Sequence, residues 1–341
     1  NNSKRESWIV EPQIEWEKQW GKARWSALFG TTYQSQTTSQ LVQIGTGFPN
    51  NNLLLNLSAA STLEINQDAD SEYRYNAIFG RVNFNWDNKY IMNLTGRRDG
   101  SSRFGSGKQF GNFGALGVAW VFSEASFLEN SSFLSFGKLR GSYGTTGSDN
   151  IGDYQFLDTY NVTGFDYNGT TILEPTGIFN PLFSWEVNKK LEAAVELGLF
   201  EDRIRFGVAW YQNRSSNQLV GIPLANTTGF TELTGNFDAT VENTGMEVDL
   251  KTINIQTRHF KWQTIFNISV PKNKLVAFPG LETSTFANSL VIGEPLTIVK
   301  LYEALGVDSE TGIYQFKDFN DDGIINSVDD RQWIADFAPT F

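Results

Sequence analysis

The stretch IFGRVNFNWDNKYIMNLTGR, residues 78–97, indicates the fold class more directly than any other part of the chain. The side chains that share one face of its first half are Ile78, Gly80, Val82, Phe84 and Trp86. Arg81 and Asn83 lie on the opposite face, and residues 90–97 repeat the alternation after the short connection Trp86–Lys89. A period of two residues is typical of a β-strand with one apolar face. The stretch therefore predicts two antiparallel strands joined by a tight turn.

The same alternation recurs along the rest of the chain. Clear patterns occupy residues 113–122, 191–199, 203–210, 246–251 and 260–270, and weaker ones occupy 8–16, 23–33 and 137–143. Together with residues 78–97 they predict about ten antiparallel strands. We therefore expect an all-β chain.

The connections between these strands alternate between short and long. The shorter ones are Gln19–Lys22, Trp86–Lys89, Ser123–Ser135, Phe200–Arg203 and Thr252–His259. The longer ones are Ser35–Asp70, Arg98–Asn112, Gly144–Asn188, Asn213–Thr240 and Pro271 to the end of the chain. An outer-membrane β-barrel has tight turns on its inner rim and large loops on its outer rim. A soluble sandwich has no reason to place every long loop on one side, so the pattern favours a transmembrane barrel.

Composition is compatible with this interpretation. The 341 residues are 40% hydrophobic and 14% aromatic, which excludes a disordered chain. No run of 18 or more apolar residues is present, so no membrane-spanning helix is expected, whereas a barrel strand needs only about 9–11 residues. The net charge of −11 argues against nucleic-acid binding. The chain has no cysteine and only one histidine, His259, so thiol catalysis and a His-based zinc site are not expected.

Two features favour lipid rather than a protein core on the apolar face. The opposite face carries Arg, Lys, Glu and Asn at many positions, as a wet or plugged lumen would. Aromatic residues also gather at strand ends: Trp86, Tyr90, Phe122, Phe200, Trp210, Tyr211 and Trp262. An aromatic girdle at each membrane interface has this arrangement. The alternative is a soluble, glycan-binding β-sandwich with aromatic core residues.

Several motifs carry a family resemblance. Residues 97–105, RRDGSSRFG, follow a predicted strand, and residues 110–120, FGNFGALGVAW, form the next one. Other motifs are FGRVNF at 79–84, LRGSYG at 139–144, IGDY at 151–154, TTGF at 227–230, VENTGME at 241–247 and DFNDDG at 318–323. In kind and in order they resemble the SusC/RagA family of TonB-dependent outer-membrane transporters, from about Tyr75 to the C-terminus.

The resemblance implies a barrel of about 22 strands with an N-terminal plug. It also implies a SusD-like surface lipoprotein as a lid, energy from a TonB–ExbB–ExbD complex, and import of oligosaccharides or peptides. The chain starts Asn1-Asn2-Ser3 without a signal segment. We therefore expect residues 1–341 to be a partial barrel domain without the plug, the TonB-contact segment, and the first and last strands.

Residues 318–329 match a calcium-type loop. Such a loop supplies oxygen ligands from positions 1, 3, 5, 7, 9 and 12 and has Gly at position 6. Here these ligands would be Asp318, Asn320, Asp322, the Ile324 carbonyl, Asn326 and Asp329, and Gly323 falls at position 6. Asp rather than Glu at the last position shortens one arm. We expect a structural Ca²⁺ within an outer loop; the alternative is an acidic, solvated loop.

Two further groups are candidate contacts for a ligand or the lid. Arg97, Arg98 and Arg103 surround an Asp-Gly turn at a strand exit, where they could contact an anionic ligand. Alternatively, they pair with acidic neighbours inside a basic hairpin. Aromatic side chains in a long loop, Tyr160, Tyr167 and Trp185, could stack on sugar faces or pack the loops together.

No catalytic site is predicted. Glu192 and Glu196 share a polar barrel face and line the lumen, whereas a glycosidase pair needs a fixed separation across a cleft. No Ser-His-Asp set, P-loop or organic-cofactor motif is present. We expect TonB-dependent import of oligosaccharides or other large nutrients across the outer membrane. The alternatives are an oligopeptide importer of the same family, a non-transporting barrel scaffold, or the soluble sandwich.

Overall fold

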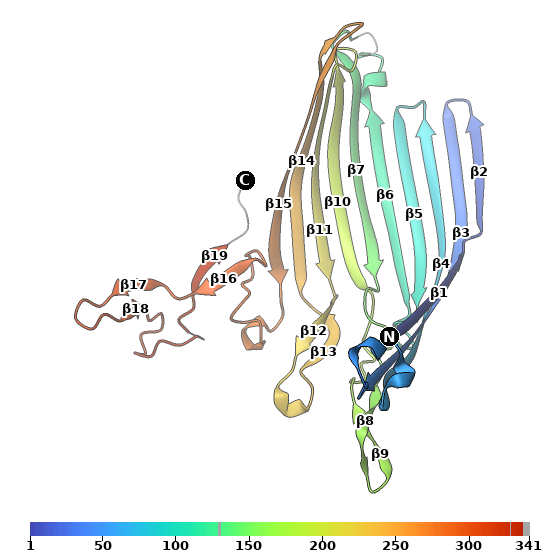
Figure 1. Cartoon of the computed structure of the whole chain (residues 1–341). Coiled ribbons are helices and arrows are strands. Elements are labelled where there is room, and N and C mark those ends of the chain that lie inside the picture. Colours follow the sequence, from blue (N-terminus) through green and yellow to red (C-terminus); the bar gives the residue numbers. More distant parts are fainter. Residues whose placement is uncertain (129–130, 328, 337–341) are drawn as a thin grey trace.

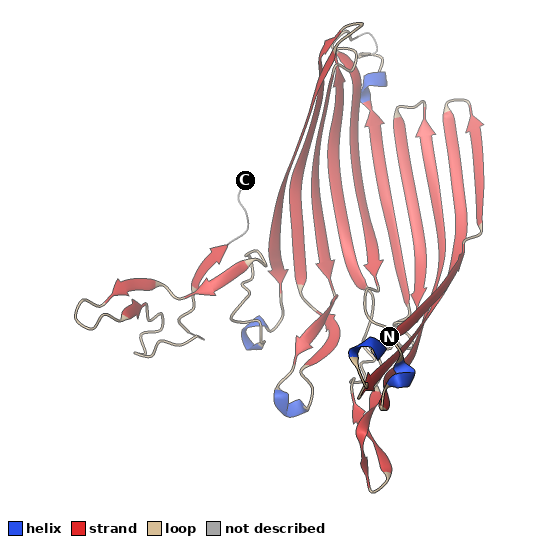
Figure 2. Ribbon diagram, in the orientation of Figure 1, coloured by secondary structure: helices blue, strands red, loops and turns tan. Residues whose placement is uncertain are grey.

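The computed structural model describes residues 1–128, 131–327 and 329–336. About half of these residues form one antiparallel sheet that curves like part of a barrel wall (Figures 1 and 2). Its strands are β1 Asn2–Val10, β2 Gln13–Trp20, β3 Ala23–Thr46, β4 Thr62–Trp86, β5 Tyr90–Ser101, β6 Phe110–Val121, β7 Leu134–Ser148, β10 Glu186–Leu199, β11 Ile204–Ser216, β14 Thr240–Gln256 and β15 Lys261–Ala277. The all-β expectation is confirmed.

The order of strands in the sheet follows the chain. It runs β1-β3-β4-β5-β6-β7-β10-β11-β14-β15, and β2 also pairs with β3. β1 and β2 therefore share one place in the sheet, which agrees with the expected number of strands. Among the described residues, no helix is long and apolar enough to cross a membrane.

The register of the strands joins the apolar residues into rows across the sheet. Trp86 lies opposite Tyr90, Tyr90 opposite Trp120, and Trp120 opposite Leu139. The row continues on the other side of β10 as Val208, Val248 and Ile268. A second row includes Phe84, Met92, Val118, Trp210, Met246 and Val270. Most of these side chains are solvent-accessible in the isolated sheet, for example Val118 at 52%. This continuous apolar surface is the one that a barrel presents to lipid.

The short connections lie together at one end of the sheet and the long segments at the other (Figure 1). Asp87 and Asn88 have φ of 55° and 54°, which gives the turn between β4 and β5 the twist that a two-strand hairpin needs. The connection between β6 and β7 is the longest of the short ones and begins with the 3₁₀ helix η3, Phe122–Glu124. Because long loops are extracellular in outer-membrane barrels, the two ends of the sheet can be assigned.

All five predicted long connections are wrong in extent, because the strands continue outside the apolar band. The predicted short connection Thr252–His259 is also too long, because β14 continues to Gln256. In the segment Ser35–Asp70, β3 and β4 pair as far as Thr46 and Thr62. In Arg98–Asn112, β5 reaches Ser101 and β6 starts at Phe110. Beyond the membrane neither face has to be apolar, so Ser, Thr and Gln on both faces conceal the strand period.

The predicted strand at residues 8–16 is also wrong, because it is two strands interrupted at Glu11 and Pro12. Pro12 has no N–H for the sheet, although its carbonyl accepts a hydrogen bond from the Thr31 N–H at 3.1 Å. The Thr32 hydroxyl is buried and donates to Glu11 Oε1 at 2.9 Å. The chain therefore changes direction here without losing its place beside β3.

The outer segments form small units of their own (Figure 1). Their strands are β8 Tyr160–Tyr167, β9 Thr170–Pro175, β12 Gln218–Pro223, β13 Glu232–Phe237, β16 Ile298–Leu301, β17 Ala304–Val307, β18 Tyr314–Phe316 and β19 Trp333–Asp336. Their 3₁₀ helices are η1 Asn51–Leu53, η2 Leu57–Ala59, η4 Asn226–Thr228 and η5 Leu281–Thr283. The pairs are β8 with β9, β12 with β13, β16 with β19 and β17 with β18.

Candidate lumen and outer-loop sites

The polar face of the wall carries a balanced group of charges. In the register of β7 and β10, Arg140 lies opposite Ala194, and this position is flanked along β10 by Glu192 and Glu196. The Arg140 guanidinium pairs with both carboxylates, at 2.9 Å for Nε to Glu196 Oε1. Lys138 adds a longer contact to Glu196, 3.7 Å. The two glutamates are therefore held by cations on a lumen surface, as the sequence predicts, and neither is positioned as a free acid or base.

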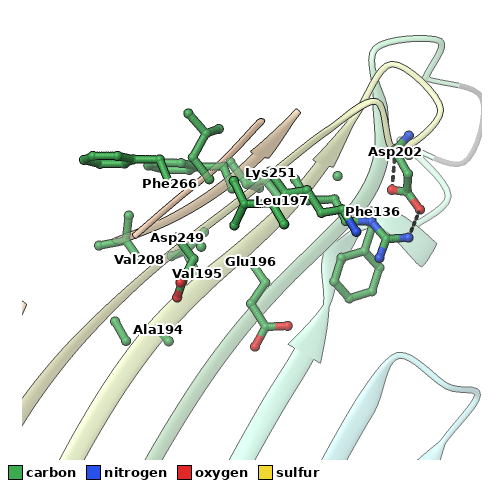
Figure 3. A pocket seen from close by; sticks show the side chains of 18 of the residues that line it. Phe136, Ala194, Val195, Glu196, Leu197, Asp202, Val208, Asp249, Lys251 and Phe266 are labelled. Atoms are coloured by element: carbon green, nitrogen blue, oxygen red, sulfur yellow. Dashed lines mark hydrogen bonds and ion pairs between the residues drawn. The ribbon is translucent and has the colours of Figure 1, made fainter. Parts of the chain in front are cut away.

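A hollow of about 680 Å³ lies on the wall near the short turn between β10 and β11 (Figure 3). Consecutive residues of both strands line it, including Val195, Glu196 and Val208, so both sheet faces contribute. Asp202 closes one end through an ion pair with Arg205 at 2.9 Å. The hollow follows the curvature of the wall and lies at the end opposite the outer loops, so it is not the place where a ligand would first bind.

At the outer end of β5, Arg97 is committed to partners inside the chain. Its Nε lies 2.8 Å from both oxygens of Asp99, whose side chain is buried. Its Nη2 donates to the Tyr75 hydroxyl at 2.6 Å. Burial, followed by the negative charge of Asp99, raises the pKa of Tyr75 to about 12. The cluster is held by a charge-assisted pair that leaves Arg97 little capacity for an anionic ligand.

Arg103 joins three outer segments. Its Nε contacts Asp153 Oδ1 at 2.9 Å, its Nη1 donates to the Asp149 carbonyl at 3.0 Å, and its guanidinium lies 4.3 Å from the centroid of the Tyr73 ring. The Tyr73 hydroxyl donates to Asp149 Oδ2 at 2.9 Å. Burial and the Asp149 carboxylate raise the pKa of Tyr73 well above its usual value. Arg103 thus matches the alternative of pairing with acidic neighbours.

Arg98 differs from the other two arginines. It is exposed, stacks on the Phe110 ring at 4.8 Å, and donates a long hydrogen bond to Asn112 Oδ1 at 3.3 Å. No ion pair to it is found among the described residues. Of the three arginines, it is therefore the one whose charge remains available at the surface.

Trp185 packs inside the outer loops. It is 7% exposed and forms a cluster with Phe104, Phe113 and Phe183. Its ring lies 5.2 Å from Phe104 and 5.6 Å from Phe113, centroid to centroid, and its Nε1 donates to the Gln109 carbonyl at 3.0 Å. The buried indole has a hydrogen-bond partner, as such a group requires. This geometry supports the packing alternative for Trp185 and not ligand stacking.

Tyr160 and Tyr167 lie on the β8–β9 hairpin, which projects beyond the rest of the sheet (Figure 1). Tyr160 is 56% exposed and Tyr167 is 74% exposed. Tyr160 pairs in register with Pro175, and Tyr167 pairs with Thr170 next to the turn. Both rings are therefore free to contact another molecule, in contrast to Trp185.

The six predicted calcium ligands lie in one loop between β18 and β19. Asp318 Oδ2 accepts a hydrogen bond from the Gly323 N–H at 2.7 Å, and Asp322 Oδ1 accepts one from the Ile324 N–H at 2.7 Å. Asn320 donates to Asp322 Oδ2 at 3.0 Å. Asn326 donates to Asp329 Oδ2 at 3.1 Å, and Val328 lies outside the described residues.

Asp318 Oδ1 is buried and has no hydrogen-bond partner in the described part of the chain. No group of three or more His, Cys, Asp or Glu side chains in that part converges closely enough to hold a metal ion. The three aspartates among the predicted ligands, Asp318, Asp322 and Asp329, therefore share a loop without forming a closed ligand shell.

Comparison with known proteins identifies the family to which this barrel wall belongs. Residues 2–297 match the family model described as TonB dependent receptor-like, beta-barrel. The chain belongs to the TonB-dependent receptor family. This barrel domain is a segment of an outer-membrane protein of the SusC/RagA type, as its motifs predict.

Named relatives agree with the family assignment. The barrel segment is 33% identical over 234 residues to TonB-dependent receptor P39 of Formosa agariphila, a match that covers 68% of this chain and 22% of the relative. It is 32% identical over 220 residues to TonB-dependent receptor SusC of Bacteroides thetaiotaomicron, which covers 62% of this chain and 22% of the relative. Among solved structures, the RagAB peptide transporter superposes with a TM-score of 0.83 at 25% identity, covering 92% of this chain and 35% of that one.

The chain thus spans only about a fifth to a third of the length of the TonB-dependent receptors that it matches. Sequence reasoning also missed several residues that shape the outer loops of this segment. Tyr73, Asp149 and Asp153 hold Arg103, and the fully buried Asp330 accepts hydrogen bonds from Phe319 and Asn326 N–H groups, each at 2.8 Å. The signal in the sequence was slight: Asp153 follows Gly152 in the motif IGDY, and Asp330 lies between Asp329 and Arg331.

Proposed function

We propose that the protein containing this segment imports oligosaccharides or other large nutrients across the outer membrane. The supporting observation is the wall itself, which has an unbroken apolar face outside and a charge-balanced polar face inside, in a TonB-dependent receptor family. A polar lumen carries hydrophilic ligands past the hydrocarbon layer without burying their hydrogen-bonding groups in lipid. The segment supplies the wall, the lumen surface and outer loops, and it has no role in bond breaking.

The partners follow from the same proposal. A SusD-like lipoprotein would cover the outer end, and a TonB–ExbB–ExbD complex would supply energy through the N-terminal part of the parent protein. On this segment, the outer-end contacts for a ligand or the lid would be the exposed Tyr160, Tyr167 and Arg98. The ring faces of both tyrosines suit stacking on a sugar ring or on a peptide side chain.

A second candidate is oligopeptide import. The observation that favours it is the match to the RagAB peptide transporter over 92% of this chain. Both candidates use the same wall, so they differ only in the ligand that the outer loops and the lid accept.

Uptake of labelled ligands by cells tests both candidates. The parent protein is deleted and then restored as wild type or as a variant without its TonB-contact segment. We expect the wild type alone to restore uptake of either a fluorescent oligosaccharide or a fluorescent oligopeptide that is too large for porins. Equal uptake by both restored strains would instead support a barrel that serves only as a scaffold.

The contact residues are tested separately. Exchange of Tyr160 and Tyr167 for Ala should weaken capture of the transported ligand about tenfold or more, since each aromatic contact adds about 0.5–1.5 kcal/mol beyond its buried area. The matched control is Tyr314→Ala, which removes a tyrosine that is 68% exposed on another outer strand. A control that weakens capture to the same degree would rule out a specific role for the β8–β9 hairpin.

A further inference from the structure

We propose that a cluster of basic side chains on the lipid-facing surface of the wall binds the phosphate group of a lipid in the outer leaflet. The cluster lies on β10, β11, β14 and β15, which are neighbours in the sheet (Figure 1). Its cations are Lys189, Arg214, Lys272 and Lys274, and its one carboxylate is Glu242. The proposal rests on the outer-membrane location of the wall and not on what the barrel transports.

The register of four strands brings the members of this basic cluster into one row. Lys189 of β10 lies opposite Arg214 of β11. Arg214 lies opposite Glu242 of β14, which in turn lies opposite Lys274 of β15. Residues directly opposite one another across a sheet have Cβ atoms about 4.5–5.5 Å apart. Four long side chains therefore meet on one face of the wall, and Lys272 joins them two residues along β15.

The basic cluster begins where the apolar surface ends. On β15, Lys272 and Lys274 follow Val270 on the same face, and on β11 Arg214 lies four residues beyond Trp210. At about 3.3 Å per residue, the cations start about 7–13 Å beyond this apolar row, toward the outer end. Lys and Arg side chains lay their apolar stems along such a surface and extend their charge into the polar layer. The charges are therefore placed at the boundary between hydrocarbon and lipid headgroups.

The chain itself does not balance the charge of the basic cluster. Arg214 Nε contacts Glu242 Oε2 at 2.6 Å. Lys189, Lys272 and Lys274 are exposed, and no ion pair to them is found in the described part of the chain. Four cations against one carboxylate leave an excess of three positive charges, although the chain as a whole carries −11. Because like charges directly opposite each other destabilise a sheet, an anion bound beside Lys189 and Arg214 stabilises this part of the wall.

A lipid phosphate fits this place better than an acidic protein surface does. The basic cluster is continuous with the face that the bilayer covers, where Met246 is 50% exposed and Val270 is 51% exposed. The acyl chains of a lipid can lie on that face while its phosphate reaches the cations. Guanidinium and ammonium groups donate charge-assisted hydrogen bonds to phosphate oxygens. A lipid thus uses both the apolar and the basic part of the surface.

Binding of lipid A to the full-length protein tests the proposal, because this glycolipid can be prepared with and without its phosphate groups. The protein is purified in a nonionic detergent and immobilised, and retention of each radiolabelled lipid is measured against lipid concentration. We expect the wild type to bind the phosphorylated form about tenfold or more tightly than the dephosphorylated form, and this preference to fall as salt is added. Equal affinity for the two forms overturns the proposal and would favour an acidic protein surface as the partner.

A double variant tests whether the basic cluster is the site. Lys189→Gln/Lys274→Gln should lose most of the preference for the phosphorylated lipid. The matched control is Lys190→Gln/Lys251→Gln, which removes the same charge from the polar face of neighbouring strands and should keep the preference. An equal loss in both variants would assign the preference to net charge and overturn the site.

Inorganic phosphate distinguishes a lipid site from a site for a soluble anion. Since a free phosphate ion gains nothing from the apolar surface beside the basic cluster, it should displace the labelled lipid no better than chloride at the same ionic strength. Stronger displacement by phosphate than by chloride would contradict the assignment to a lipid.

Discussion

The hairpin of β4 and β5 between Ile78 and Arg97 and the outer segment between Gly144 and Asn188 are stabilised in different ways. In the hairpin, the period of two along the strand decides which face of the sheet a side chain lies on. The register then decides which residue lies opposite, as Phe84 lies opposite Met92. In the outer segment, the decisive contacts join residues far apart in the chain. Arg103 and Asp153, for example, are separated by 50 residues.

The difference reflects the two solvents. Lipid accepts no polar group, so every second residue of the wall must be apolar and the pattern is strict. Water accepts both polar and apolar residues, so the outer loops need a core of their own, which Phe104, Phe183 and Trp185 provide. The wall is therefore encoded locally, and the outer loops are encoded by long-range packing.

The largest expected effect is the loss of that outer core. Phe183 is fully buried, and exchange of a buried Phe for Ala costs about 3–5 kcal/mol. Phe183→Ala should therefore open the loop of residues 144–188 to protease. The wall should stay folded, which is measured by the shift in electrophoretic mobility that an intact barrel shows before heating.

The control for this prediction lies in the same segment. Phe179 is 56% exposed, so Phe179→Ala should leave the protease resistance of the loop unchanged. If both variants open the loop equally, the buried cluster does not hold it. If Phe183→Ala also unfolds the barrel, the wall and the outer loops are not independent.

The stability of the wall should depend on which face of the sheet carries an added charge. Leu94 is 51% exposed on the apolar face, midway along β5 between Tyr90 and Arg98. Leu94→Arg should cost about 2–4 kcal/mol because it places a cation near the middle of the bilayer. Asn93→Arg places the same side chain one residue away on the lumen face, where Asn83 donates to Asn93 at 2.9 Å, and should cost much less.

Unfolding of the full-length protein in lipid vesicles, followed by tryptophan fluorescence against denaturant, measures both variants. A loss of stability that is the same for Leu94→Arg and Asn93→Arg would contradict the assignment of the two faces. Because the period of a strand is two, the assignment of one position fixes the rest of β5.

The same contrast explains how far the sequence could predict this molecule. The strands within the apolar band were predicted to within a few residues, because Val82, Leu94 and Leu116 had to point outward together. The extension of β3 and β4 was missed because residues such as Thr37 and Gln40 follow no pattern of hydrophobicity. Outside the membrane, backbone pairing alone can continue a strand.

The candidate contacts show a similar limit. Sequence could name Trp185 and Tyr167 as aromatics of one loop, but only the position of Phe104 decides that Trp185 is buried. Likewise, the charge of Arg103 indicated either a ligand or an internal partner, and Asp153 decides between them. The calcium-type spacing of residues 318–329 stays a prediction, because the spacing can be read from one short segment but the positions of its side chains cannot.

A smaller effect is expected at Arg103. Its side chain is 21% exposed, and removal of its charged hydrogen bonds to Asp153 and the Asp149 carbonyl should cost about 1–3 kcal/mol. Arg103→Gln should raise hydrogen exchange in the segment around Asp149 and Asp153 and leave the wall unchanged. Arg98→Gln is the control, because the exposed Arg98 stacks on Phe110 and donates to Asn112 but forms no ion pair within the described residues. Equal hydrogen exchange in the two variants would show that the contacts of Arg103 do not stabilise the outer loops.

The smallest expected effect depends on pH. The folded protein holds the pKa of Tyr75 at about 12, above the value of 10.0 for a free tyrosine. Because the fold favours the neutral phenol, the Tyr75 contribution to stability is fully present below about pH 10 and is lost as the pH rises through about 12. Tyr75→Phe should therefore remove part of the alkaline loss of stability and one late-titrating tyrosine from an absorbance titration. The apolar band of β4 begins beyond Asn76, so Tyr75 lies outside it. Ionisation of Tyr75 should therefore leave the register of the wall intact, as measured by amide exchange in β4 and β5. An alkaline transition that is unchanged in Tyr75→Phe would assign the loss to another group, such as Tyr73, whose pKa is also raised.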